Sequence, residues 1–194
     1  KAIVAEIGPD RKPIPGTEEH YDCDTLLLSC GLLPENELSR AAGVALSPIT
    51  GGPSVNESLE TNIPGVFAAG NVLHVHDLVD YVSEEAGAAG EHAAAYILKS
   101  EHAAGRTLPV RCKNGVRYTV PTTIRPDCAG DTVTLRFRVG GVYKNKKIAV
   151  YLGDTCIFSR RRPVLAPGEM ETVRLKSDLL RGAGDAVTVT LEEG

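Results

Sequence analysis

Hydrophobic residues in the first hundred positions come in short continuous runs rather than in alternation. Residues 1–7 form one such run, and the glycines and prolines at residues 8–16 predict that it belongs to a small antiparallel hairpin. Residues 23–30 (CDTLLLSC) hold three consecutive leucines, which predicts a strand buried on both faces, as in a parallel sheet. A proline- and glycine-rich loop is expected at residues 47–65, and residues 66–69 (VFAA) predict a second buried strand.

Two helices are expected around these strands. Residues 36–42 predict a short helix that ends at a glycine. Residues 83–99 are rich in alanine and predict a longer helix. Ser83 is its expected N-cap, and the carboxylates of Glu84 and Glu85 would complement the helix dipole.

Beyond a linker expected at residues 100–110, the hydrophobic pattern changes to a period of two. In residues 132–139 the apolar side chains fall on one face of the predicted strand, and Thr134, Arg136 and Arg138 fall on the other. Further strands are expected at residues 148–152, 155–159, 170–175 and 186–191. Short strands at this spacing predict an all-β domain, an immunoglobulin-like sandwich.

Charge divides the chain in the same way. The formal net charge of −4 combines −10 over residues 1–100, from 5 Lys or Arg and 15 Asp or Glu, with +6 over residues 101–194, from 16 and 10. We therefore predict two domains, residues 1–104 and residues 105–194. The basic charges alternate with apolar residues, so we expect them on the solvated face of a sheet and predict no nucleic-acid partner. No apolar run approaches the roughly 18 residues that cross a membrane.

The five cysteines form no C-x-x-C pair and are scattered, which argues against a disulfide framework and against a zinc site. We expect buried or half-buried thiols in a reducing cytoplasm, including Cys30 inside its apolar strand. The run of Arg160, Arg161 and Arg162 is interpreted as a solvated strand end, with binding of an anion or a partner subunit as the alternative.

Candidate chemistry is concentrated in residues 61–71 (TNIPGVFAAGN), where a tight Pro-Gly turn precedes the second predicted strand. Ligands of open α/β sheets bind at the carboxyl ends of the strands, and this strand ends on Gly70 and Asn71. Gly70 lets the backbone approach a ligand closely, and the Asn71 side chain can hydrogen-bond a sugar hydroxyl. The N-terminal N–H groups of the helix from Ser83 suit a partial negative charge.

This stretch resembles the second FAD-binding motif of the pyridine nucleotide–disulfide oxidoreductases, T-x-x-x-x-[VI]-[FY]-A-x-G-D. The matching residues are Thr61, Val66, Phe67, Ala68 and Gly70. Asn71 stands where the family usually has Asp, so a hydrogen-bond acceptor is kept and the charge is lost. Residues 23–34 (CDTLLLSCGLLP) are similar to a second family element, D-x-x-[LIV]-x-x-x-G-x-x-P, which lies at the crossover from the NAD(P) domain to the FAD domain.

The resemblance covers about residues 1–100 and implies an α/β fragment, the C-terminal portion of a doubly wound FAD/NAD(P)-binding fold. It implies an enzyme that transfers hydride between NAD(P)H and FAD and passes electrons to an unidentified acceptor. The cofactor-binding residues that the family pattern assigns are Gly70, Asn71, Val82, Ser83 and Glu84. Asn71 is expected at the ribitol of FAD, and the three helix residues are expected near the isoalloxazine ring.

Other parts of such an enzyme are missing from the sequence. It contains no G-x-G-x-x-G phosphate-binding fingerprint and no redox-active C-x-x-C, and the resemblance places the fingerprints upstream of Lys1. We therefore expect a piece of a longer protein, inactive and without FAD by itself, whose open sheet edges pair with another copy in a homo-oligomer. The alternative is a non-catalytic interaction module, the β-sandwich, attached to a degenerate flavoprotein remnant.

His74 and His76 follow the motif directly, in the sequence HVHDLVD. One interpretation is a proton donor or a substrate contact near the flavin. Together with Asp77 and Asp80 they suggest a metal site, but the spacing is not that of a known ligand set, and we predict no metal. The third interpretation is a solvated or helix-capping cluster.

Overall fold

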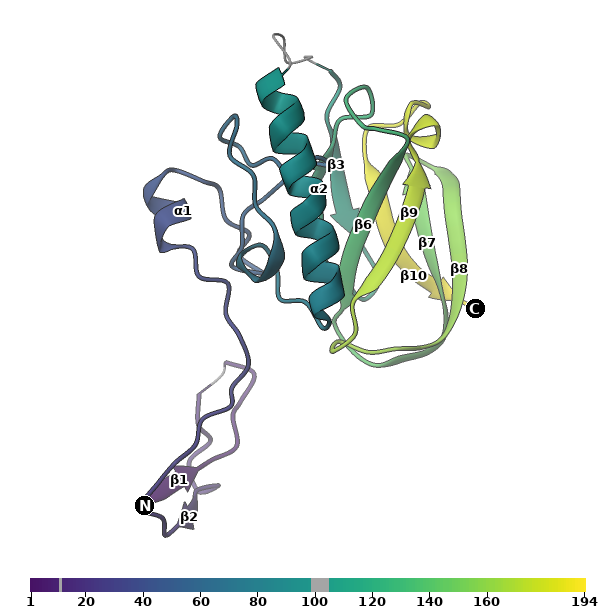
Figure 1. The fold of residues 1–194 in the computed structure, drawn as a ribbon. Coiled ribbons are helices and arrows are strands. Elements are labelled where there is room, and N and C mark those ends of the chain that lie inside the picture. Colours follow the sequence, from purple (N-terminus) through teal and green to yellow (C-terminus); the bar gives the residue numbers. More distant parts are fainter. Residues whose placement is uncertain (11, 99–104) are drawn as a thin grey trace. The chain divides into compact units, whose positions relative to one another are not determined.

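The structure is a computed structural model, and it describes residues 1–10, 12–98 and 105–194. It divides into two compact units, Lys1–Gly31 and Leu32–Gly194, whose elements are labelled in Figure 1. Residues 100–104 of the linker predicted at residues 100–110, and with them the predicted end of the first domain at residue 104, lie outside the described residues.

The unit Lys1–Gly31 is built on one antiparallel hairpin. Strand β1 (Ala2–Val4) pairs with β2 (Glu19–Tyr21), with Ile3 directly opposite His20. The hairpin predicted from the apolar run and the turn residues is therefore confirmed.

Residues 23–30 do not form the buried strand that their leucines predict. They have no regular secondary structure, and Leu26, Leu27 and Leu28 are 63%, 90% and 77% exposed. A strand buried on both faces needs a neighbour on each side and cover above and below. The described residues of this unit provide only the β1–β2 pair, so the leucines and Cys30 stay exposed, and the prediction for both is wrong here.

The helical segments of the unit Leu32–Gly194 are α1 (Glu37–Ala41), the 3₁₀ turn η1 (Gly70–Val72) and α2 (Val79–Leu98). Helix α1 confirms the predicted short helix. Helix α2 begins four residues before Ser83, so Ser83 lies inside the helix and is not the predicted N-cap. The upstream residues contain no helix breaker, and Asp80 in the first turn complements the dipole. None of the helices within the described residues is long and apolar enough to span a membrane.

The second buried strand, predicted at residues 66–69, does not form. In its place the structure has one isolated antiparallel β-bridge between Glu60 and Phe67. Ala68 is buried as predicted, whereas Val66 is exposed. The reason is the same as for residues 23–30, because no further strand of the described chain lies alongside to extend the pairing.

The strands of the β part are β3 (Leu108–Cys112), β4 (Val116–Val120), β5 (Thr123–Ile124), β6 (Thr132–Val139), β7 (Tyr143–Leu152), β8 (Thr155–Leu165), β9 (Glu171–Lys176) and β10 (Val187–Glu193). Strands β6 to β10 confirm the strands predicted from the period-two pattern. Strand β3 overturns the linker interpretation of residues 108–110. Pro109 is tolerated in it because it faces only Thr123 of the two-residue β5 at the edge of the sheet.

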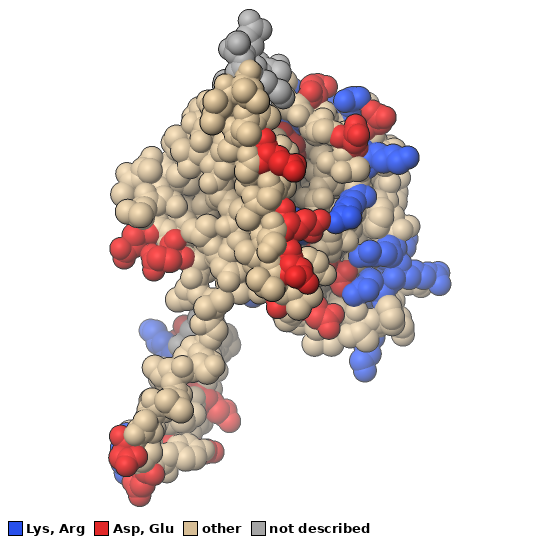
Figure 2. Space-filling view, in the orientation of Figure 1, with Lys and Arg blue, Asp and Glu red and all other residues tan. Residues whose placement is uncertain are grey.

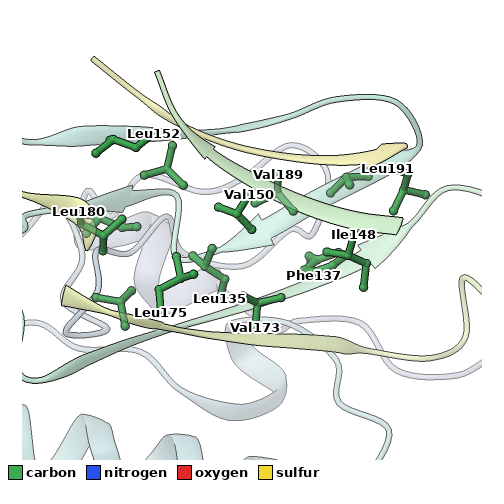
Figure 3. Packing of buried hydrophobic residues seen from close by; sticks show 14 of the residues in the cluster. Leu135, Phe137, Ile148, Val150, Leu152, Val173, Leu175, Leu180, Val189 and Leu191 are labelled. Atoms are coloured by element: carbon green, nitrogen blue, oxygen red, sulfur yellow. The ribbon is translucent and has the colours of Figure 1, made fainter. Parts of the chain in front are cut away.

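These strands form two sheets that enclose one apolar core. The five-stranded sheet has the order β5-β3-β10-β7-β8 and the three-stranded sheet the order β4-β6-β9, and only β3 and β10 run parallel. Figure 3 shows Leu135 and Phe137 of β6 directed toward Ile148 and Val150 of β7, and all four side chains are completely buried. The immunoglobulin-like topology stays a prediction.

Helix α2 lies against the outer face of the three-stranded sheet (Figure 1). A second, smaller core fills this junction, in which Tyr118 and Val120 of β4 pack with Leu73 and with Ala89 of α2. Residues 61–71, which resemble the FAD-binding motif, are called the FAD-like motif below. The segment that follows them therefore shares its core with the β part.

Candidate functional site

The FAD-like motif ends in a turn that requires glycine. Thr61 donates its backbone N–H to the carbonyl of Val66 at 2.8 Å, which closes the Pro-Gly turn. Gly70 then opens η1 with φ +69°, a left-handed conformation that favours glycine. A Cβ at Gly70 would lie 3.2 Å from Cγ1 of Val82. The backbone at Gly70 is thus held close to α2.

Asn71, the predicted ribitol contact, is exposed, and only the oxygen of its side-chain amide is hydrogen-bonded within the protein. Its Oδ1 accepts the backbone N–H of His76 at 3.1 Å. The amide Nδ2 makes no hydrogen bond to any described residue, so it remains a donor that faces outward. The acceptor that the sequence assigned to a ligand is therefore engaged by the protein.

The three predicted helix residues point in different directions. Val82 packs against Gly70, and Ser83 is exposed in the second turn of α2. The Glu84 carboxylate contacts Arg136 of β6 at 3.0 Å and Arg174 of β9 at 2.5 Å. The structure thus brings Val82 to the motif, while Glu84 turns toward the β sheet.

The centre of this region is Glu85, which is completely buried. Its Oε1 accepts the Gly70 N–H at 2.8 Å and lies 3.0 Å from His76 Nε2, and its Oε2 lies 3.0 Å from His74 Nε2. Burial by itself would raise the pKa of Glu85, but the hydrogen bonds from His74 and His76 outweigh burial and lower that pKa to about 2. One carboxylate anion therefore organises the segment from Gly70 to His76.

The same carboxylate reaches into the β part. Arg136 is buried, with Nη1 3.6 Å from Glu85 Oε2 and Nη2 3.0 Å from Glu84 Oε2. The prediction that Arg136 lies on a solvated face is wrong, because α2 covers that face and presents acids to it. Figure 2 shows the acidic groups in the region of α2 beside the basic groups of the strands.

A second contact from β6 holds the following loop. Arg138 donates from Nη2 to the backbone carbonyl of Val75 at 3.0 Å and to the Asp77 carboxylate. Asp77 also accepts the Met170 N–H at 2.6 Å. Asp77 is therefore an anchor of the loop to the β part, and it does not join the histidines in a ligand set.

His74, His76 and Glu85 carry ligand atoms that all lie within 4.8 Å of one another. A cation bound through the two Nε2 atoms would leave both buried Nδ1 atoms as N–H donors, and neither has a partner among the described residues. Metal-bound histidines ordinarily donate that second N–H to an acceptor, and the Arg136 guanidinium also repels a cation here. The arrangement favours a hydrogen-bonded network around the Glu85 anion.

Arg160 and Arg162 of β8 both form ion pairs with one buried carboxylate of β9, that of Glu171. Glu171 Oε1 lies 2.7 Å from Arg162 Nη2, and its Oε2 lies 3.2 Å from Arg160 Nη2. All three arginines lie within β8 rather than at its end, so the strand-end part of the interpretation is wrong, whereas Arg160 and Arg161 are exposed as predicted.

The exposure of most cysteines differs from the prediction of buried or half-buried thiols. None of the five forms a disulfide, and Cys23, Cys30, Cys112 and Cys156 are exposed rather than packed.

Glu85 and Arg136 are the functional candidates that the sequence pattern missed. Glu85 was assigned only to the helix dipole, and Arg136 only to a wet strand face. The opposite charges of the two halves were the one signal that pointed to their pairing, since a −10 segment and a +6 segment attract each other.

Comparison with known proteins places the motif in context. Residues 2–95 match the family described as pyridine nucleotide-disulphide oxidoreductase. A segment of 59 residues is 32% identical to a protein named NADH oxidase from Methanocaldococcus jannaschii. That segment is 30% of this chain and spans only 13% of the relative's length. No solved structure matches the chain.

Proposed function

Residues 2–95 belong to the pyridine nucleotide-disulphide oxidoreductase family, and from this premise we propose that the chain is part of an FAD-dependent enzyme. The enzyme transfers hydride between NAD(P)H and FAD and passes electrons to an acceptor still to be identified. Bound FAD supplies the redox chemistry, and the protein binds and orients it. The relative named NADH oxidase supports the nicotinamide nucleotide as co-substrate.

The observation that carries this proposal is the geometry of Gly70 and Asn71. Gly70 keeps the backbone free of a side chain where it turns, and Asn71 presents an exposed amide donor beside it. The Asn71 amide fits a ribitol hydroxyl, which needs a polar partner, and Gly70 allows the turn that presents this amide. The first turn of α2, from Val79, adds backbone N–H groups that suit the partial negative charge of the flavin edge. Val82, Ser83 and Glu84 stay the predicted flavin neighbours.

The β part completes the proposal. We assign residues 105–194 to an immunoglobulin-like sandwich, for which the two sheets and the shared core are the support. We also propose a homo-oligomer and a cytoplasmic location, for which the exposed Leu27 and the exposed thiols of Cys23 and Cys30 are the support.

The test is FAD binding by the full-length protein, measured by flavin absorbance and by titration of the apoprotein. We expect one FAD per chain, with Asn71→Asp binding about tenfold more tightly and Asn71→Leu about tenfold more weakly than the wild type. Ser58→Ala is a matched control, because Ser58 lies outside the motif and should leave the affinity unchanged. A colourless full-length protein that takes up no added FAD would refute the proposal.

A second candidate function has one observation in its favour. The Asn71 Oδ1 already accepts the His76 N–H, and the motif lacks the charge that the family usually has at this position. That loss is expected of an interaction module attached to a flavoprotein remnant. It predicts that Asn71→Asp and Asn71→Leu behave alike and that neither binds FAD.

A further inference from the structure

Two arginines of β6 contact the segment that follows the FAD-like motif. Arg136 and Arg138 are two positions apart, so they lie on the same face of the strand, and α2 covers that face. Arg136 reaches Glu85, and Arg138 reaches Val75 and Asp77. Each arginine therefore ends on a group that fixes part of the segment from Gly70 to Asp77.

Arg136 is linked to the Gly70 turn through a single carboxylate, that of Glu85. Glu85 Oε1 holds the Gly70 N–H, and both oxygens hold the histidine rings. Arg136 is the one Lys or Arg that forms an ion pair with Glu85 in the described part of the chain. A completely buried anion with one cation beside it depends on that cation for its placement.

The contact through Arg138 acts on the next residues. Its guanidinium ties the Val75 carbonyl and the Asp77 carboxylate to β6, on either side of His76. The His76 N–H in turn donates to Asn71 Oδ1, which sets the rotamer of the Asn71 side chain. The outward direction of the Asn71 amide therefore depends on where β6 holds this loop.

We propose that Arg136 and Arg138 are positioning residues for the FAD-facing turn Gly70–Asn71, so that the β part is a working component of the flavin site. This inference rests on the proposed function. Arg136 fixes the turn through Glu85, and Arg138 fixes the orientation of Asn71 through the Val75–Asp77 loop. Neither arginine is assigned a contact with the cofactor.

The first arm of the test needs no flavin. Backbone amide hydrogen exchange is followed by NMR in the 194-residue chain, with Gly70 and His76 as reporters and Ile148 in the β core as the internal reference. Arg136→Met should speed exchange at Gly70 about tenfold or more, and Arg138→Met should do the same at His76, because each amide loses an anchored acceptor. Arg136→Lys should restore most of the protection at Gly70.

Arg174→Met is the matched control, because Arg174 pairs with the exposed Glu84 and has no ion pair with Glu85 or Asp77 among the described residues. It should change exchange at either reporter by less than about twofold. If Arg136→Met does not fold, Arg138→Met decides, since Arg138 lies outside both buried cores. Unchanged protection at both reporters, or equal loss in the Arg174→Met control, would overturn the proposal.

The second arm measures FAD affinity in the full-length protein. Arg136→Met and Arg138→Met should each weaken FAD binding about tenfold, with Arg136→Lys and Arg174→Met close to the wild type. Exchange that quickens without any change in FAD affinity would refute the positioning role and leave the proposed function intact. If the wild type binds no FAD, the proposed function fails, and the positioning role for the flavin site fails with it. The hydrogen-exchange arm then still measures how the β6 arginines hold Gly70 and His76.

Discussion

At the scale of single residues, the chain holds a carboxylate anion where no water reaches it. Glu85 is completely buried, and an isolated ion there would be strongly destabilising. It is tolerated because Gly70, His74 and His76 all donate to it and Arg136 stands beside it. Such a group is favourable only while every partner is in place.

Glu85→Gln tests this balance. Glutamine has one acceptor oxygen in place of two and brings an NH₂ group that faces existing donors. We expect a loss of about 3 kcal/mol in the free energy of unfolding, measured by urea denaturation. Glu84→Gln, one residue earlier on the same helix and half exposed, should lose less than about 1 kcal/mol. Equal losses in the two variants would contradict the central role of Glu85.

Stability should also fall on acidification. Burial, the largest cause, lowers the pKa of His74 below its ordinary 6.5, so below that pH the unfolded chain binds this proton more readily than the folded one. The pKa of Glu85 falls from 4.5 to about 2, so between those values the unfolded chain again binds the extra proton. Both groups therefore stabilise the fold above pH 6.5, and the stabilisation is lost stepwise as the pH falls toward 2.

Urea unfolding at a series of pH values measures this dependence. In Glu85→Gln the fall below pH 4.5 should be reduced, because the titrating carboxylate is gone. A wild-type stability that stays constant between about pH 7 and pH 3 would show that these groups do not titrate as their surroundings require.

At the scale of elements, a loop and the segment after η1 meet backbone to backbone. A Cβ on Gly52 would lie 1.7 Å from the carbonyl oxygen of Leu73, a distance that no side chain can occupy. Nearby, Asn36 is buried and donates from Nδ2 to the carbonyls of Gly51 at 3.1 Å and Val72 at 2.8 Å. This close approach of the loop to the segment after η1 is possible only as long as residue 52 is glycine.

Gly52→Ala should cost at least about 2 kcal/mol of stability, because the neighbouring atoms are backbone and cannot move aside. Gly87→Ala is the opposite case, since Gly87 lies within α2 and a Cβ there meets nothing within 4 Å. It should stabilise the chain by about 0.5–1 kcal/mol through helix propensity. Thermal unfolding of both variants compares them directly, and a Gly52→Ala protein as stable as wild type would contradict the close approach.

At the scale of the whole molecule, the unit Leu32–Gly194 has two cores, and the smaller one joins the motif segment to the β part. Leu73 and Ala89 pack there with Tyr118 and Val120 of β4. Arg125 adds an ion pair with Glu57 at 3.0 Å. A segment that shares its core with a sheet cannot unfold without exposing that sheet.

We therefore expect the unit to unfold in one cooperative transition. Leu73→Ala in the smaller core and Leu135→Ala in the larger one should each cost about 2–5 kcal/mol and should lower the same calorimetric transition. Circular dichroism and tyrosine fluorescence should report the same midpoint. Two separate transitions, each lowered by only one of the variants, would contradict a shared unit.

The purified 194-residue chain should carry no FAD and should be colourless. The sequence contains no glycine fingerprint for the FAD pyrophosphate, and that cradle supplies much of the affinity for such a nucleotide. Absorbance and mass spectrometry under native conditions measure the cofactor content and also the oligomeric state. Stoichiometric FAD in this chain would refute the expectation, and a monomer would refute the homo-oligomer.

The local pattern of the sequence determined most of the β part and the ends of the motif. Period-two alternation predicted β6 and β7, whose apolar side chains enter the shared core, and the motif predicted the Pro-Gly turn that the Thr61–Val66 hydrogen bond closes. Only the tertiary structure decided that Leu27 stays exposed and that Arg136 is buried. Burial of a strand or of a charge depends on what lies across from it, and those neighbours are distant in the sequence. For the same reason the pairing of Glu85 with Arg136 became visible only in the folded chain.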